Sequence, residues 1–162
     1  MPRLAYNRRA RWRFSILEKW EAGIELTGQE VKSVKNGRID LMHAFVTVRI
    51  LPARAKQKQK LSAVLTNCYI PKYERAGSAA PYDPRRPRQL LLRREQLKRM
   101  TGLLEQKGLT IVPLSMYTRN HLVKLEIGLA RGKTEFDKRD TIRRRETDRQ
   151  MRSAARRAVQ HH

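Results

Sequence analysis

The sequence predicts a mainly β fold with helices, in which about six short strands form a small closed barrel with two packed helices. Three observations indicate this class. Apolar and polar residues alternate in several short segments between residues 13 and 130. Two longer segments carry apolar residues at the spacing of one helix face. From residue 131 onward the chain is densely charged and has no proline, which predicts a tail outside the hydrophobic core.

We therefore expect three regions: a basic N-terminal arm at residues 1–12, the barrel at 13–130, and a basic C-terminal tail at 131–162. The 162 residues include 37 Lys or Arg and 15 Asp or Glu, a formal net charge of +22. Arginine outnumbers lysine 25 to 12. Because guanidinium groups pair with phosphates and stack on bases, this bias favours a nucleic-acid partner over a membrane surface.

Targeting signals are missing from the sequence. No apolar run approaches the roughly 18 residues that a membrane-spanning helix needs, and the first residues lack the apolar segment of a signal peptide. We expect a cytoplasmic protein with no membrane partner, present as a monomer.

The first strand is expected to end in a turn at Gly23, before a second short strand at residues 24–26. Thr27 and Glu30 have the spacing of a capping box, in which each side chain accepts a hydrogen bond from the other residue's backbone amide. A short helix should follow and end at Gly37.

Alternating residues at 46–50 and 61–65 predict a hairpin, joined by a basic loop at 52–60. Four prolines within 71–89 predict a long loop.

A second helix is expected over about 93–107, followed by a hairpin of 109–118 against 122–130 that turns near Asn120 and His121. Among small barrels of this kind the OB-fold is the nearest member.

The tail has helix-forming residues but too few apolar ones to dock on a core. We expect it to be mobile when free and to become helical along a polyanion. The alternative is a solubilising tail with no ordered state.

Enzymatic chemistry has little support in the sequence. Cys68 is the single cysteine, so there is no disulfide framework and no Cys-x-x-Cys metal site. The histidines form no metal-binding pair, and we expect no metal, no cofactor and no catalysis. A nuclease that uses Cys68 and His43, or a histone-like DNA compactor, would be alternatives from composition alone.

Several longer runs occur in one fixed order and cover the chain from residue 7 to about 150. They are 7–11 (Asn-Arg-Arg-Ala-Arg), 21–33 (Glu-Ala-Gly-Ile-Glu-Leu-Thr-Gly-Gln-Glu-Val-Lys-Ser), 83–92 (Asp-Pro-Arg-Arg-Pro-Arg-Gln-Leu-Leu-Leu), 107–114 (Lys-Gly-Leu-Thr-Ile-Val-Pro-Leu) and 127–133 (Ile-Gly-Leu-Ala-Arg-Gly-Lys) followed by 137–139 (Asp-Lys-Arg). In these runs the chain closely resembles the small protein B family, the SsrA-binding proteins that partner transfer-messenger RNA in bacteria. Trp12 stands where the family often has histidine, and the 52–60 loop is longer than usual.

The resemblance implies an RNA-binding adaptor in trans-translation with an OB-like barrel. Such an adaptor binds the tRNA-like domain of transfer-messenger RNA and delivers it, with elongation factor Tu, to stalled ribosomes. Its tail then enters the small-subunit decoding centre, formed by 16S-type ribosomal RNA, and the empty mRNA channel. A ribosomal protein or another OB-type translation factor is the alternative.

The resemblance and the local chemistry together assign three groups of residues. The expected RNA-binding residues are Asn7, Arg8, Arg9, Arg11, Glu21, Gly23, Glu30, Lys32, Arg88, Leu91, Arg93, Arg131, Gly132 and Lys133. The expected decoding-site contacts are Phe136, Asp137, Lys138 and Arg139. The expected mRNA-channel residues are Arg143, Arg144, Arg145, Arg149 and Arg152.

Three of these roles also have a stated physical reason. Glu21 would accept a hydrogen bond from a base edge, because a carboxylate otherwise weakens phosphate binding. Leu91 would be either a core residue or an exposed contact for unstacked bases. Phe136 would stack on a base of the decoding site.

Overall fold

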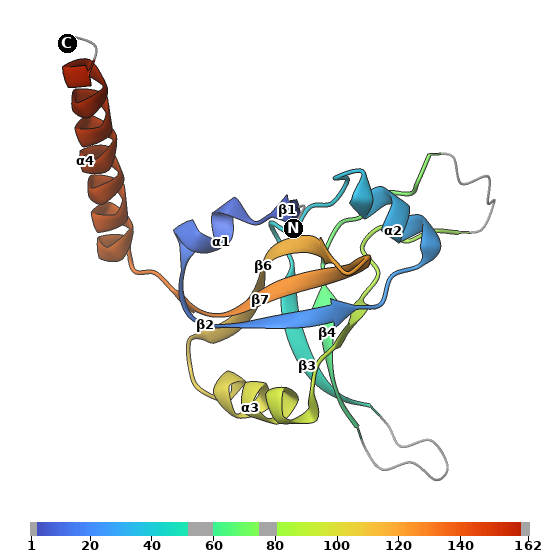
Figure 1. The fold of residues 1–162 in the computed structure, drawn as a ribbon. Helices are drawn as coiled ribbons and strands as arrows, with labels where there is room; N and C mark the ends of the chain where they lie inside the picture. The colour runs from blue at the N-terminus through green and yellow to red at the C-terminus, as the bar shows by residue number, and fades with distance from the viewer. Residues whose placement is uncertain (1–2, 52–59, 75–80, 160–162) are drawn as a thin grey trace, which may run out of the picture.

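The computed structural model describes residues 3–51, 60–74 and 81–159. Strands dominate, and a few helices lie around them (Figure 1). The elements are β1 (Arg3–Tyr6), α1 (Arg8–Arg13), β2 (Phe14–Ile24), α2 (Gly28–Lys35), β3 (Phe45–Leu51), β4 (Lys60–Thr66), β5 (Arg88–Leu91), α3 (Arg94–Leu104), β6 (Leu109–Arg119), β7 (Leu122–Gly132) and α4 (Glu135–Val159). The predicted mainly β class is confirmed.

The strands pair in the order β1-β6-β3-β4-β5-β2-β7, and β6 also pairs with β7. Six of the seven strands therefore form a closed ring in which each described pair is antiparallel, and β1 is attached to β6. The sequence suggested a different set of strands. The expected turn at Gly23 is wrong, since β2 runs unbroken through it, while β1 and β5 were not anticipated.

Three predicted local structures are confirmed. The Thr27 amide donates to Glu30 at 2.8 Å and the Glu30 amide donates to Thr27 Oγ1 at 3.4 Å, which is the capping box at the start of α2. Gly37 follows that helix with φ +74°, a conformation that suits glycine. Asn120 and His121 join β6 to β7 with φ of 49° and 63°, as a tight hairpin turn requires.

The core fills the ring and continues under two helices. Leu65, Ile111 and Ile127 inside the ring are fully buried. Val34 of α2 and Met100 of α3 belong to the same buried cluster. Both helices therefore pack against the ring, as expected from their apolar spacing.

The N-terminal residues are part of the folded body. The region expected to be a basic arm, residues 1–12, is described from residue 3 onward and lies in β1 and α1, and Ala10 of α1 packs with Val112 and Leu114 of β6. Trp12, which stands where the family often has histidine, is 38% exposed on α1. This anchoring fixes where the arginines of α1 lie.

The tail forms α4, which projects away from the ring of strands (Figure 1). Thr134 and Asp137 cap its first turn, because the Thr134 hydroxyl donates to Asp137 Oδ2 at 2.8 Å and the Asp137 amide donates back to that hydroxyl. The coupling of helix formation to binding stays a prediction. Of the helices described, none is both long and apolar enough to span a membrane.

Candidate nucleic-acid interface

A surface groove of about 560 Å³ lies where β2, β4, β5 and β7 meet the start of α3. Strand pairing creates it: Gly23 of β2 is opposite Leu91 of β5 on one side and opposite Lys124 of β7 on the other. The groove is lined by Glu21, Gly23, Lys60, Leu61, Ser62, Gln89, Leu90, Leu91, Leu92, Arg93, Gln96, Leu97 and Lys124. Four of the expected RNA-binding residues, taken from two distant sequence runs, therefore meet in one place.

Leu91 gives the groove an exposed apolar surface. Its side chain is 52% exposed, whereas its neighbour Leu90 is buried at 2%. Leu91 is therefore not a core residue, and its contact with unstacked bases stays a prediction. Gly23 keeps this surface open, because a Cβ on it would lie 3.1 Å from Leu91 Cβ. An open aliphatic surface of this kind suits contact with a flat, unstacked base.

Glu21 is held in place at the rim of the groove. The Tyr117 hydroxyl donates a short hydrogen bond to Glu21 Oε2, and Arg119 Nη1 donates to the same oxygen at 3.2 Å. The hydrogen bond from Tyr117 is the main reason that the pKa of Glu21 is lowered, with Arg119 and Lys124 adding to the effect. Burial and the bond to Glu21 raise the pKa of Tyr117 to about 12. At neutral pH Glu21 is therefore an oriented carboxylate, able to accept a further hydrogen bond from a base amino group.

Cations surround this carboxylate. Lys60, Arg93 and Lys124 all line the groove, and both Lys60 and Arg93 are exposed. The Arg93 amide donates to Gln96 Oε1 at 2.9 Å, which fixes the start of α3 and leaves the Arg93 side chain outside the core. A groove that combines apolar side chains with cations suits a nucleic-acid strand, whose bases contact the apolar groups and whose phosphates pair with the cations.

Glu30 and Arg88 were expected to bind RNA, but their side chains are fully buried. Glu30 accepts from Arg86 Nε at 2.8 Å and from Arg88 Nε at 2.9 Å. Arg88 also donates to the carbonyls of Cys68 at 2.7 Å and Pro84 at 3.0 Å. Burial alone would raise the pKa of Glu30, but hydrogen bonds from Arg86 and the Thr27 amide, with the charge of Arg88, lower it. In this structure the pair joins α2 to β5 and has no polar atom free for RNA.

Asn7 also differs from its expected role. It is 5% exposed, and its Nδ2 donates to Leu41 O at 2.9 Å and to Pro113 O at 3.0 Å. Its Oδ1 accepts from the Ala10 amide and caps α1. Asn7 thus fixes the direction in which α1 leaves β1, and the structure gives it a positioning role in place of a direct RNA contact.

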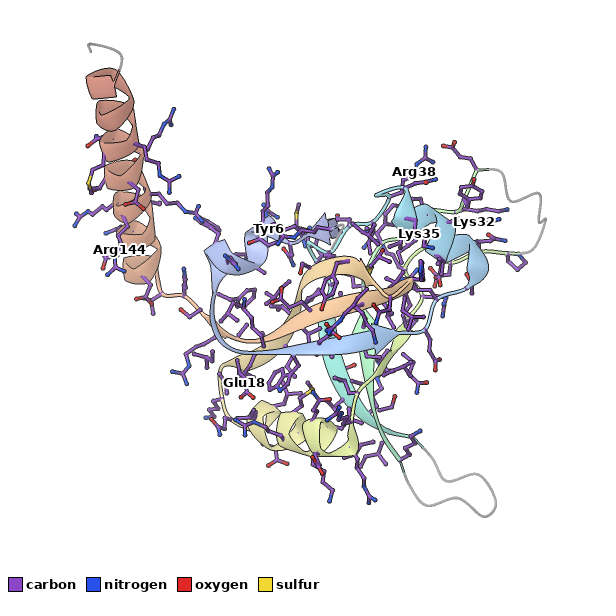
Figure 2. All side chains as sticks on the ribbon, viewed as in Figure 1. Tyr6, Glu18, Lys32, Lys35, Arg38 and Arg144 are labelled. Carbon is purple, nitrogen blue, oxygen red and sulfur yellow. The ribbon has the colours of Figure 1, made fainter. Side chains whose placement is uncertain are left out.

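The other basic candidates of the body are on the surface. Arg8, Arg9 and Arg11 are exposed on α1, where Arg11 lies over the Tyr6 ring at 5.7 Å. Lys32 is exposed on α2, with Nζ 5.5 Å from the centre of the Tyr73 ring. Figure 2 shows Lys32 together with Lys35 and Arg38 at the α2 side of the molecule. These groups form basic surfaces separate from the groove.

The junction between the sheet and α4 is anchored. Gly132 pairs with Phe14 at the end of β7, and Arg131 pairs with Ser15. The Lys133 amide donates to Arg13 O at 2.9 Å, and its Nζ donates to Arg11 O at 3.1 Å. Gly132 is therefore held by strand pairing at the point where the chain leaves the sheet for α4.

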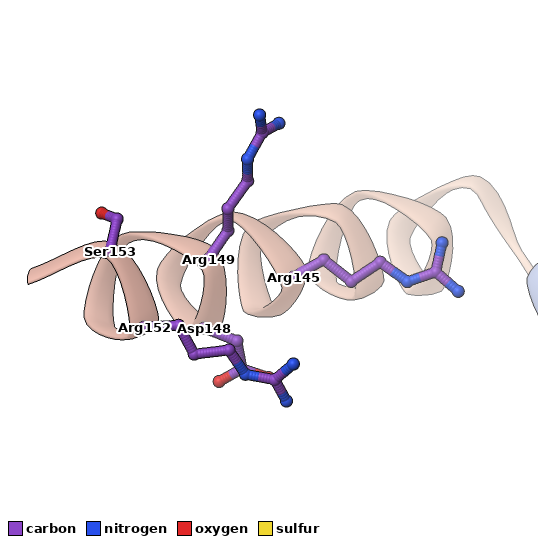
Figure 3. A pocket seen from close by; sticks show the side chains of 5 residues that line it. All are labelled: Arg145, Asp148, Arg149, Arg152 and Ser153. Carbon is purple, nitrogen blue, oxygen red and sulfur yellow. The ribbon is translucent and has the colours of Figure 1, made fainter. Parts of the chain in front are cut away.

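The tail presents arginines around the outside of α4. Arg139, Arg143, Arg144, Arg145, Arg149 and Arg152 are all exposed. A shallow hollow here is lined only by residues of α4. Figure 3 shows that Arg149 and Arg152 leave the helix in different directions. The hollow is an open helix surface and not a closed ligand site. Asp137 caps the helix, while the side chains of Phe136 and Lys138 lie outside the described residues.

The nucleophile considered above is not available. Cys68 is fully buried, and burial raises the pKa of its thiol to about 12. Such a thiol stays protonated and is a weak nucleophile. Within the described part of the chain, no group of three or more His, Cys, Asp or Glu side chains could hold a metal ion.

Several groove residues were missed from the sequence. Lys60, Ser62, Gln96 and Lys124 line the groove, and Tyr117 with Arg119 orients Glu21. The alternation of 123, 125, 127 and 129 already placed Lys124 on the outer face, so this residue could have been found. No sequence signal links Tyr117 to Glu21, because the contact joins β6 to β2 across β7.

Fold and groove together define a class of protein: a strongly basic, strand-rich RNA-binding protein whose groove is lined by apolar side chains and cations. Comparison with known proteins identifies the family. Residues 4–157 match the family model described as SmpB protein, and the chain belongs to the SmpB family. The resemblance inferred from the sequence runs is thereby confirmed.

Individual relatives agree with this assignment. The chain is 46% identical over 151 residues to the SsrA-binding protein of Gloeothece citriformis (strain PCC 7424), covering 93% of this chain and 91% of the relative. It is 44% identical over 153 residues to the SsrA-binding protein of Coprothermobacter proteolyticus, covering 94% and 95%. A solved chain described as "tmRNA-SmpB: a journey to the center of the bacterial ribosome" is 43% identical, with TM-score 0.63 over 88% of this chain and 96% of that one.

Proposed function

We propose that this chain is an RNA-binding adaptor of trans-translation that binds the tRNA-like domain of transfer-messenger RNA through the groove. The convergence of Glu21, Gly23, Leu91 and Arg93 on one groove carries this proposal. Glu21 selects a base edge, Leu91 supports an unstacked base, and Arg93 binds phosphate. Membership of a family whose relatives are named SsrA-binding proteins supports the choice of RNA.

The adaptor reaches the ribosome through α4. The exposed arginines of this helix neutralise the 16S-type ribosomal RNA of the small subunit as the helix enters the decoding centre and the empty mRNA channel. Phe136, Asp137, Lys138 and Arg139 meet the decoding site at the start of the helix. The similarity to a tmRNA-SmpB chain of the bacterial ribosome supports this location.

The remaining features follow from the same role. The ring of strands serves as an OB-like barrel, and elongation factor Tu joins through the aminoacylated transfer-messenger RNA. The chain acts in the bacterial cytoplasm as a monomer and performs no catalytic step. A ribosomal protein or another OB-type translation factor is not favoured, because the family match covers nearly the whole chain.

The direct test is to purify the chain from cells and to sequence the RNA that comes with it. Enrichment of transfer-messenger RNA over ribosomal RNA supports the proposal. Recovery of ribosomal RNA without any tRNA-like RNA contradicts it. Leu122→Ala is the control, because Leu122 is also exposed, at 60%, but lies at the β6–β7 turn. If Leu91→Ala loses the enrichment and Leu122→Ala keeps it, the groove is the site of binding.

A further inference from the structure

The groove contains a buried hydroxyl with no partner. Ser62 of β4 lines the groove and is 3% exposed, and its Oγ has no hydrogen-bond partner among the described residues. A buried hydroxyl without a partner destabilises a folded protein, so such groups are uncommon and call for a specific reason. A ligand that supplies the missing partner is one such reason.

Strand register places this hydroxyl next to the exposed leucine. Ala63 of β4 pairs with Leu90 of β5, and both are buried. Since side chains alternate between the two faces of a strand, Ser62 and Leu91, each one residue away, share the outer face. On the other side, Leu91 is opposite Gly23. Leu91 therefore stands between a glycine and a serine on its two neighbouring strands, and both of these neighbours are small.

We propose that Ser62 belongs to a nucleotide subsite, in which an unstacked RNA base lies on Leu91 and its edge hydrogen-bonds Ser62 Oγ. This inference rests on the proposed function and adds to it a recognition residue on the β4 side of the groove. The base displaces the side chains that cover the hydroxyl. Lys60 and Arg93, which line the same part of the groove, hold the phosphates on either side of this nucleotide.

The lining of the groove suits a base better than a purely anionic ligand. Five leucines and one unpartnered hydroxyl line it, and a phosphate alone would leave this apolar surface in contact with water. A base covers the leucines and offers both donors and acceptors along its edge. The hydroxyl of Ser62 can donate or accept, so it can pair with either.

The test compares Ser62→Ala with Thr66→Val in the full-length chain. Thr66 lies in the same strand, and its Oγ1 is also buried without a partner, but it does not line the groove. Binding is measured by fluorescence anisotropy with the labelled tRNA-like domain of transfer-messenger RNA at fixed salt. We expect Ser62→Ala to weaken binding about five-fold, the loss expected for one hydrogen bond. Thr66→Val should bind as the unsubstituted chain does.

Denaturation with urea separates recognition from folding. Removing an unpartnered hydroxyl should leave the unfolding midpoint of both variants unchanged or higher. Weaker binding with an unchanged or higher midpoint supports the subsite. Unchanged binding by Ser62→Ala, or a loss of binding that follows a lower midpoint, overturns it. If the unsubstituted chain itself fails to bind the tRNA-like domain, the proposed function fails instead, so the two results are distinguishable.

Discussion

Replacing Glu30 by glutamine should destabilise the whole fold, although the two side chains have nearly the same size and shape. The Glu30 carboxylate is fully buried and accepts from the Thr27 amide, Arg86 and Arg88. Arg88 is equally buried, and Glu30 is the carboxylate with which it forms its salt bridge in the described residues. The variant therefore leaves a buried guanidinium with no compensating charge and turns an amide NH₂ toward guanidinium donors.

Removing one partner of a buried ion pair costs about 3–5 kcal/mol. A domain of this size has a total free energy of unfolding of about 5–15 kcal/mol, so Glu30→Gln should lose a large part of it. Glu18→Gln is the matched control, because Glu18 also pairs with an arginine, Arg99, at 2.9 Å. That pair is on the surface, where an ion pair contributes about 0–1 kcal/mol.

Urea denaturation followed by tryptophan fluorescence measures both variants, since Trp20 is buried at 8% and reports on unfolding. We expect a much lower midpoint for Glu30→Gln and a nearly unchanged one for Glu18→Gln. If the two variants differ by less than about 1 kcal/mol, the pair does not have the role in stability that we derive from its burial.

The pH dependence gives an independent check on the same pair. The pKa of Glu30 is lowered from an ordinary value near 4.5, so its contribution to stability is present above that value. It is lost as the pH falls through the lowered pKa of the folded state. The unsubstituted chain should therefore lose stability in acid, and Glu30→Gln should show a flatter profile because glutamine does not titrate. Parallel profiles would contradict the assignment.

Further predictions concern the groove and the tail, and two assays measure them: binding to the tRNA-like domain and peptide tagging on stalled ribosomes. Glu21→Ala should weaken RNA binding several-fold although the protein becomes more basic; unchanged or tighter binding at matched salt would show that Glu21 accepts from no base. Gly23→Ala should weaken binding because its Cβ would lie 3.1 Å from Leu91 Cβ, whereas Gly28→Ala, with open space around it, should not; equal effects would argue against a close fit at Leu91. Truncation after Lys133 should abolish tagging but largely keep RNA binding, and equal loss of both would mean that α4 is not a separable element.

Local sequence signals predicted the parts of the fold that depend on neighbouring residues. The Thr27–Glu30 capping box and the turn at Asn120–His121 are short-range features, and both are present. Pairing between distant strands could not be predicted in the same way. The short β5 shows no alternation of its own and exists because β2 and β4 flank it.

The site was predictable in its exposed part. The family resemblance and the local chemistry identified Glu21, Gly23, Leu91 and Arg93, which share the groove. They could not show that Glu30, Arg88 and Asn7 are buried, because a charged or polar residue in a sequence gives no sign of the partners that compensate its burial. These three residues hold elements of the fold together: Glu30 and Arg88 join α2 to β5, and Asn7 caps α1.

Photo-crosslinking from position 91 tests the central claim most directly. A photoreactive side chain replaces Leu91 in the full-length chain, and the complex with intact transfer-messenger RNA is irradiated and sequenced at the crosslinked nucleotides. Crosslinks confined to the tRNA-like domain are expected, with none from the same group placed at Leu122. Crosslinks spread over the whole RNA, or equal yields from both positions, would contradict the assignment of the groove as the RNA-binding surface.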